Sequence, residues 1–142
     1  MRARLGAGLV AASVAVSLLL GASAAGASTQ AGAARWRLVD YQQEGCFSPN
    51  VHDTYFGVYI QGRWRSAIDV GASGLPAGGT YDTSYAPIAP GQSTGEFTLA
   101  YVHVTLPTST PLGSYTGSMW ANDGSVTRQV PIVMNVQDRC GY

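Results

Sequence analysis

Hydrophobic and polar residues alternate along most of the chain from Arg35 onward. In residues 55–60, for example, Phe56, Val58 and Ile60 share one side. A period of two, carried by aromatic and β-branched residues, predicts half-buried β-strands. The segments with this pattern are residues 36–41, 55–60, 64–70, 81–85, 96–106, 114–121 and 125–136. Short strands separated by turn signals predict an all-β fold, either a sandwich or a barrel.

The connections between these segments also follow from the pattern. Residues 61–63 are expected to form a hairpin loop, because an odd number of loop residues sets Ile60 opposite Trp64 and keeps the apolar faces aligned. Residues 122–124, Asn-Asp-Gly, predict a second hairpin turn. Residues 42–53 are expected to be a loop. The last three strands are expected to be neighbours in one sheet.

The first part of the chain has a different pattern. Arg2 and Arg4 precede an almost purely apolar run at residues 9–20, and small residues follow. This order is typical of a secretory signal peptide, and the apolar run is short for a membrane span. An uncleaved N-terminal anchor is the alternative. The predicted organisation is a signal peptide at 1–27, a lead-in at 28–34 and a single domain at 35–142. The mature protein is therefore expected to be secreted, extracellular and free of the membrane.

The chain contains two cysteines, Cys46 and Cys140. In an exported protein an even number of cysteines indicates a disulfide, and two cysteines allow a single intramolecular pairing. A metal pair or an intermolecular bridge is the alternative, but a metal site needs further ligands nearby. The sequence therefore predicts a Cys46–Cys140 bridge.

Charge excludes one class of partner. The chain has 8 Arg and Lys residues against 8 Asp and Glu residues, and none of the cations is Lys. Removal of residues 1–27 takes Arg2 and Arg4 with it and leaves six Arg against eight acids, a net charge of −2. Nucleic-acid binding needs a basic stripe that neutralises phosphates. The sequence gives no sign of one, so nucleic acid is not an expected partner.

Several stretches between residues 74 and 136 resemble the immunoglobulin-like modules appended to bacterial secreted peptidases and glycoside hydrolases. The matching stretches are residues 74–78 (GLPAG), 88–93 (IAPGQS), 97–99 (FTL), 109–117 (STPLGSYTG) and 122–124 (NDG). The resemblance implies an immunoglobulin-like antiparallel β-sandwich of about seven strands. Such modules usually serve as spacers, stabilisers or contact surfaces. The two cysteines and the Trp-rich first half depart from that pattern.

The sequence offers no persuasive catalytic or metal site. His52 and Asp53 are adjacent, but adjacent side chains rarely aim at a common target, so a solvated loop explains them. His103 is expected on a strand surface. The eight acids are scattered, and Asp123 is explained by turn chemistry. We therefore expect a non-enzymatic protein without a metal or cofactor.

Outward aromatic residues are the remaining candidate for function. If Val102 and Met119 face inward, the opposite face carries the first candidate surface, Tyr101, His103 and Trp120. A second candidate surface is Tyr55, Tyr59, Arg63 and Arg65. Exposed aromatic residues flanked by polar groups suit a polysaccharide or an extracellular protein. The alternatives are that Trp120 belongs to the core, and that the protein is an inhibitor or effector that presents the 42–53 loop to a partner protein.

Overall fold

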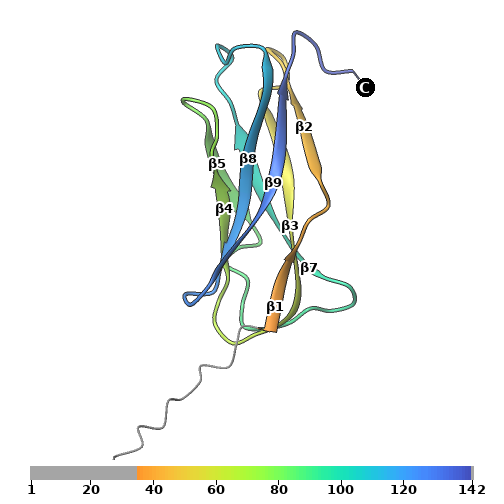
Figure 1. The fold of residues 1–142 in the computed structure, drawn as a ribbon, viewed down its shortest axis with the longest axis vertical. Coiled ribbons are helices and arrows are strands. Elements are labelled where there is room, and N and C mark those ends of the chain that lie inside the picture. Colours follow the sequence, from red (N-terminus) through yellow and green to blue (C-terminus); the bar gives the residue numbers. More distant parts are fainter. Residues whose placement is uncertain (1–34, 142) are drawn as a thin grey trace, which may run out of the picture.

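The computed structural model describes residues 35–141, which form nine β-strands and no helix (Figure 1). The predicted signal peptide and lead-in lie outside these residues. Among the described residues, no helix is long and apolar enough to span a membrane. The strands are β1 (Arg35–Val39), β2 (Gln43–Phe47), β3 (Asp53–Trp64), β4 (Asp69–Ser73), β5 (Thr80–Ser84), β6 (Gly91–Gln92), β7 (Thr98–Thr105), β8 (Gly113–Asn122) and β9 (Thr127–Val136).

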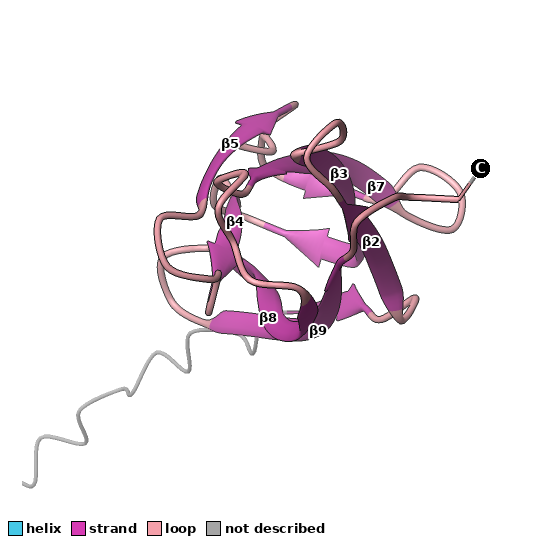
Figure 2. Cartoon of the chain, turned by 90° about the horizontal axis from the view of Figure 1, so that it is seen from above, coloured by secondary structure: helices cyan, strands magenta, loops and turns pink. Residues whose placement is uncertain are grey.

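The strands form two sheets that face each other across one core, which makes the fold a sandwich (Figure 2). The five-stranded sheet has the order β1-β3-β7-β5, and β6 pairs with β3. The four-stranded sheet has the order β2-β9-β8-β4. All pairs are antiparallel except β2 with β9, which is parallel. The all-β prediction is therefore confirmed.

The core is built by the alternation that the sequence shows. In β3, Phe56, Val58 and Ile60 are buried, and in β7 the inward residues are Ala100, Val102 and Val104. The inward residues of β8 and β9 face them from the other sheet and include Met119, Ile132 and Met134. The burial of apolar surface is the main stabilising contribution of such a core, at about 25 cal/mol for each Å² removed from water.

The hairpin predicted at residues 61–63 is wrong. β3 continues through Gly62 to Trp64, and β4 lies in the other sheet. The alternation of Ile60 with Trp64 fits an unbroken strand as well as it fits an odd loop, because the period of two continues across Gly62. Gly62 has a φ of 113°, and its Cα faces the backbone carbonyl of Arg35, so β1 can approach closely.

The loop predicted at residues 42–53 is also wrong over half its length. Residues Gln43–Phe47 form β2, which pairs with β9. The chain leaves β1, passes Gln42 with a φ of 52° and enters the other sheet. The pairing of β1 with β3 ends at Val39 and Tyr59, and beyond it the side-chain amide of Gln43 hydrogen-bonds to the backbone of β3. Its Nε2 donates to the Gly57 carbonyl at 2.8 Å, and its Oε1 accepts from the Gly57 amide at 2.7 Å.

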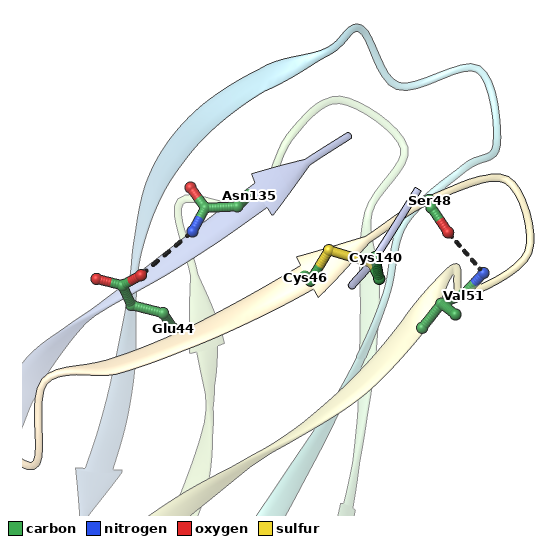
Figure 3. Close-up of a disulfide and its surroundings, with 6 residues drawn as sticks. All are labelled: Glu44, Cys46, Ser48, Val51, Asn135 and Cys140. Carbon is green, nitrogen blue, oxygen red and sulfur yellow. Dashed lines mark hydrogen bonds between the residues drawn. A yellow bond between two sulfur atoms is a disulfide. The ribbon is translucent and has the colours of Figure 1, made fainter. Parts of the chain in front are cut away.

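Cys46 and Cys140, the predicted pair, form a disulfide with Cα atoms 5.8 Å apart (Figure 3). Cys46 lies in β2 rather than in a loop, and Cys140 lies beyond the end of β9. Asn135 on β9 also donates a hydrogen bond to Glu44 on β2 at 3.3 Å. The bridge therefore fastens the parallel edge strand β2 to the segment that follows β9.

The last three strands are not neighbours in one sheet, contrary to the prediction. β8 and β9 form a hairpin whose turn includes residues 122–124, but β7 pairs with β3 and β5 in the other sheet. Pro131 is tolerated in the middle of β9 because β2 begins alongside the next residue, Ile132. β9 is thus an edge strand locally at Pro131, where no ladder donor is needed.

Candidate functional site

The outer surface of the five-stranded sheet brings most of the predicted surface residues together. Tyr55 and Tyr59 project from β3, and their cross-strand partners on β7 are His103 and Leu99. Tyr101 pairs with Gly57, between the two tyrosines. Tyr41 and Phe97 approach from the flanking loops. The tyrosine face, as we call this surface, consists of Tyr41, Tyr55, Tyr59, Phe97, Tyr101 and His103.

One end of the tyrosine face is a cluster of aromatic rings in edge-to-face contact. Tyr41 and Phe97 pack against Tyr59 with ring centroids 4.5 and 4.9 Å away. The Tyr59 ring lies over Gly57, where a Cβ would come within 2.5 Å of it. Such perpendicular contacts stabilise the orientation of each ring by about 0.5–1.5 kcal/mol per pair. The rings therefore form a fixed surface.

The other end is organised around His103. Its Nε2 is 2.8 Å from Asp53 Oδ2, its Nδ1 is 3.4 Å from Asp82 Oδ2, and its ring stacks on Tyr55 with centroids 4.3 Å apart. Burial by itself would lower the pKa of His103, but the hydrogen bonds and charges of Asp53 and Asp82 outweigh it, so the pKa is raised from its ordinary value of 6.5. Three strands, β3, β7 and β5, contribute to this contact.

The arrangement around His103 does not resemble a catalytic base. Both ring nitrogens face carboxylates, so neither is free to accept a proton from a substrate. The His52–Asp53 pair does not form either. Asp53 turns to His103, while the His52 carbonyl accepts a hydrogen bond from the Leu106 amide. Within residues 35–141, no group of three or more His, Cys, Asp or Glu residues could hold a metal ion.

Arginines extend the tyrosine face at the end of β3 away from Asp53. Arg63 lies directly opposite Arg35 on β1, and Arg37 donates to Gln61 at 2.6 Å. Arg65 follows the end of β3 and lies outside its pairing register. Among the described residues, the ion pairs are those of His103, so these arginines have no acidic partner there. Like charges directly opposite each other destabilise a sheet, so this end of the face carries an electrostatic cost.

Trp120 does not join Tyr101 and His103. It projects from the outer surface of the four-stranded sheet, because β8 and β7 belong to different sheets. Its ring lies over Gly71 on β4, and its Nε1 donates to the Ala72 carbonyl at 3.2 Å. The first candidate surface is therefore split, and Tyr101 and His103 belong instead with Tyr55 and Tyr59.

A shallow concavity of about 450 Å³ surrounds Trp120. Its lining comes from three neighbouring strands, β4, β8 and β9. The residues that line it are Asp69, Ser73, Trp120, Asn122, Thr127 and Gln129. Apart from the indole, every lining side chain is polar, so this surface differs in chemistry from the tyrosine face.

A family model described as a family of unknown function (DUF5980) matches residues 37–138. The chain belongs to the DUF5980 family. Among solved structures, it is similar to a family 123 glycoside hydrolase from Clostridium perfringens, with a TM-score of 0.48 and 8% identity over 71% of this chain and 24% of that chain. The chain thus spans about a quarter of that enzyme's length, and a likeness at this level carries no functional argument. Curated proteins gave no match.

The DUF5980 region includes residues of the tyrosine face that sequence reasoning missed. Tyr41 and Phe97 lie outside the strands and reach the face through their rings. Asp82 lies opposite His103 on the edge strand β5. The alternation in residues 81–85 indicates that Asp82 and Ser84 lie on the same side of a strand. It does not indicate which strand lies beside them. The position of Arg35 opposite Arg63 depends likewise on the pairing of β1 with β3, which local alternation does not predict.

Proposed function

We propose that this protein is an exported, non-enzymatic interaction module that binds an extracellular protein through the tyrosine face. The observation that carries the proposal is the gathering of Tyr55, Tyr59, Tyr101 and His103 on one sheet surface. Tyr55, the third residue of β3, is 62% exposed although β3 is a central strand of its sheet. Large exposed aromatic residues on a sheet surface are typical of interaction sites.

The composition of the tyrosine face supports a protein as the partner. Tyr, Phe and Arg are enriched at protein interfaces, and Tyr and Arg are frequent among the residues that dominate binding energy. Edge-to-face packing holds Tyr41, Tyr59 and Phe97 in place before binding, which lowers the entropic cost of association.

The charges at the two ends of the face support a specific orientation of that partner. Arg35, Arg37 and Arg63 lie at one end, and Asp53 and Asp82 lie at the other. Asp53 and Arg63 lie ten positions apart on an extended strand, which corresponds to roughly 33 Å. A partner with acidic groups at one end of its surface and basic groups at the other would relieve the Arg35–Arg63 repulsion. Electrostatic complementarity of this kind sets orientation and association rate.

We further propose that the sandwich is immunoglobulin-like. The orders β1-β3-β7-β5 and β9-β8-β4 correspond to the ABED and GFC sheets of that fold. Tyr115, near the start of β8, donates its hydroxyl to the Pro111 carbonyl at 2.8 Å, as in the tyrosine corner of such domains. The Cys46–Cys140 bridge departs from the usual inter-sheet disulfide.

Export is the remaining part of the proposal. The basic, apolar and small-residue order of residues 1–27 supports a cleaved signal peptide and an extracellular location. The disulfide is compatible with an oxidising compartment. N-terminal sequencing of the protein recovered from culture medium tests this part, with a new N-terminus at Ser28 as the expected result.

Site-specific photo-crosslinking tests the tyrosine face. A photoreactive phenylalanine analogue is placed at Tyr55 and, as a matched control, at Leu112, which is 59% exposed and lies in the loop before β8. We expect one extracellular protein to crosslink at position 55 and not at position 112. The captured protein is then purified and its affinity measured against the Tyr55→Ala and Tyr101→Ala variants.

We expect each of these variants to bind the purified partner at least tenfold more weakly, while Leu112→Ala binds it unchanged. Equal crosslinking at the two positions, or unchanged affinity in both tyrosine variants, would show that the tyrosine face is not the binding surface.

A further inference from the structure

We infer that the concavity around Trp120 is a second binding site, separate from the tyrosine face, and that its ligand is a neutral saccharide. The site lies on the outer surface of the four-stranded sheet, whereas the tyrosine face lies on the five-stranded sheet. The inference is independent of the proposed protein partner. It rests on a positioned indole, free polar side chains around it and the charge of the lining.

The indole of Trp120 is fixed in position before any ligand arrives. One side of its ring lies on Gly71, where a Cβ would collide with the ring, and Nε1 donates to the Ala72 carbonyl at 3.2 Å. The side of the ring away from Gly71 remains for a ligand. The face of an aromatic ring is electron-rich and attracts the C–H groups of a sugar ring. A pre-positioned ring also lowers the entropic cost of binding.

Polar side chains surround the indole in the concavity. Asp69 and Asn122 are cross-strand partners on β4 and β8, and Gln129 is the partner of Trp120 on β9. Within residues 35–141, the side chains of Asp69, Ser73 and Gln129 make no hydrogen bond or ion pair. A carboxylate accepts hydrogen bonds and an amide both donates and accepts, so together they match the paired donors and acceptors of sugar hydroxyls.

The charge of the lining narrows the ligand class. Asp69 is the one charged residue among those that line the concavity, and no lining residue is basic. An acidic saccharide or a phosphate would meet a carboxylate without a cation, so a neutral saccharide is favoured. A quaternary ammonium ligand usually requires a cage of several aromatic rings, and this site has one. The volume of about 450 Å³ lies within the range of ligand sites.

Tryptophan fluorescence offers a direct assay. Trp36 and Trp64 are 2% and 6% exposed, so Trp120 is the indole that solvent and ligand can reach. The full chain, exported and purified from the medium, is titrated with neutral hexasaccharides of glucose, xylose, mannose and N-acetylglucosamine and, separately, with choline. A microarray of neutral glycans extends the set. We expect a saturable fluorescence change with at least one neutral glycan and none with choline.

Variants locate the binding. Asp69→Asn and Gln129→Ala change exposed side chains that make no hydrogen bond or ion pair within residues 35–141, so both should fold, and we expect each to weaken binding at least fivefold. Gly71→Ala keeps the indole but displaces it, and we expect at least a tenfold loss. Tyr101→Ala, on the opposite sheet, is the matched control and should bind the glycan normally.

Three results would overturn the inference. The first is the absence of saturable binding to every neutral glycan in the titrations and on the array. The second is a response to choline alone. The third is full retention of glycan binding in Asp69→Asn, Gln129→Ala and Gly71→Ala together, which would place the glycan elsewhere. Loss of the protein partner at the tyrosine face would leave this inference unaffected, because the two sites lie on different sheets.

Discussion

At the scale of single residues, half-buried polar side chains join segments that lie far apart in the sequence. Asp123 is the clearest case. Turn chemistry explains one of its oxygens, because Oδ1 accepts from the Ser125 and Val126 amides, both at 2.9 Å. Its other oxygen accepts from Trp36 Nε1 at 2.8 Å, across 87 residues of sequence. One carboxylate therefore ties the β8–β9 turn to β1.

Asp123→Asn should destabilise the protein by about 1–3 kcal/mol at pH 7, because a charged acceptor is lost at a partly buried site. Burial by itself would raise the pKa of Asp123, but hydrogen bonds from Trp36, Ser125 and Val126 hold it well below its usual range. A lowered folded pKa means that the stabilisation is complete above the unfolded pKa of about 3.9 and is lost as pH falls below it. Urea unfolding at pH 7 and pH 3 should show the difference between wild type and variant shrinking at low pH. A constant difference would contradict the assignment.

His103 should show the opposite pH dependence. Because its folded pKa is raised, the Asp53–His103–Asp82 contact stabilises the protein fully below the unfolded pKa of about 6.5, and this stabilisation is lost as pH rises through the folded pKa. An NMR titration of the His103 ring should give a midpoint above 6.5. Asp53→Asn and Asp82→Asn should each lower that midpoint. A midpoint at or below 6.5 in the wild type would show that the carboxylates do not engage the ring.

At the scale of strands, local alternation predicted which side of each strand is buried but not which strand lies beside it. Phe56, Val102 and Met134 are buried as their parity required. The prediction that β7 lies in one sheet with β8 and β9 was wrong, because β7 pairs with β3, a strand distant in sequence. β2 was missed for a different reason. Its sequence, QEGCF, has one large apolar residue, Phe47, so no alternation marks it.

The candidate site could also be predicted only in part from local alternation. The outward placement of Tyr101, His103 and Tyr55 could be derived from period-two patterns. Their assembly into one face, and the separation of Trp120 from them, could not, because both depend on the order of strands in the two sheets. The Asp82–His103 contact was equally out of reach, since it joins an edge strand to a central strand.

Gly62 tests the continuity of β3 directly. Gly62→Ala should destabilise the protein because Gly62 has a φ of 113° and a Cβ there would collide with the Arg35 carbonyl on β1. Gly124→Ala is the matched control, with a φ of 86° and nothing within 4 Å of a Cβ. The control should cost about 1 kcal/mol for its backbone conformation alone, and Gly62→Ala should cost clearly more. Equal losses in urea unfolding would favour the hairpin loop at residues 61–63 instead.

At the scale of the whole molecule, the fold is held by one core shared between two sheets and by one disulfide. The Cys46–Cys140 bridge spans a sequence separation of 94 and secures β2, the parallel strand at the edge of the four-stranded sheet. The two outer surfaces lie on opposite sides of the sandwich because they belong to different sheets. One carries aromatic rings and opposed charges, and the other carries one indole among polar groups.

Replacement of both cysteines by alanine should lower the free energy of unfolding by about 2–5 kcal/mol, because the unfolded chain regains the freedom that the long closed loop removes. Hydrogen exchange should show the largest loss of protection in β2 and in the last residues of β9. Unchanged stability, or a loss of protection centred on β5, would contradict the role given to the bridge.

The most direct test of the tyrosine face is covalent footprinting of the protein in the culture of the organism that produces it. Hydroxyl-radical labelling is compared between that setting and the purified protein, at Tyr55, which is 62% exposed, and at Leu112, which is 59% exposed and lies in the loop before β8. We predict strong protection of Tyr55 in the native setting and unchanged labelling of Leu112. Equal labelling of Tyr55 in both settings would contradict it.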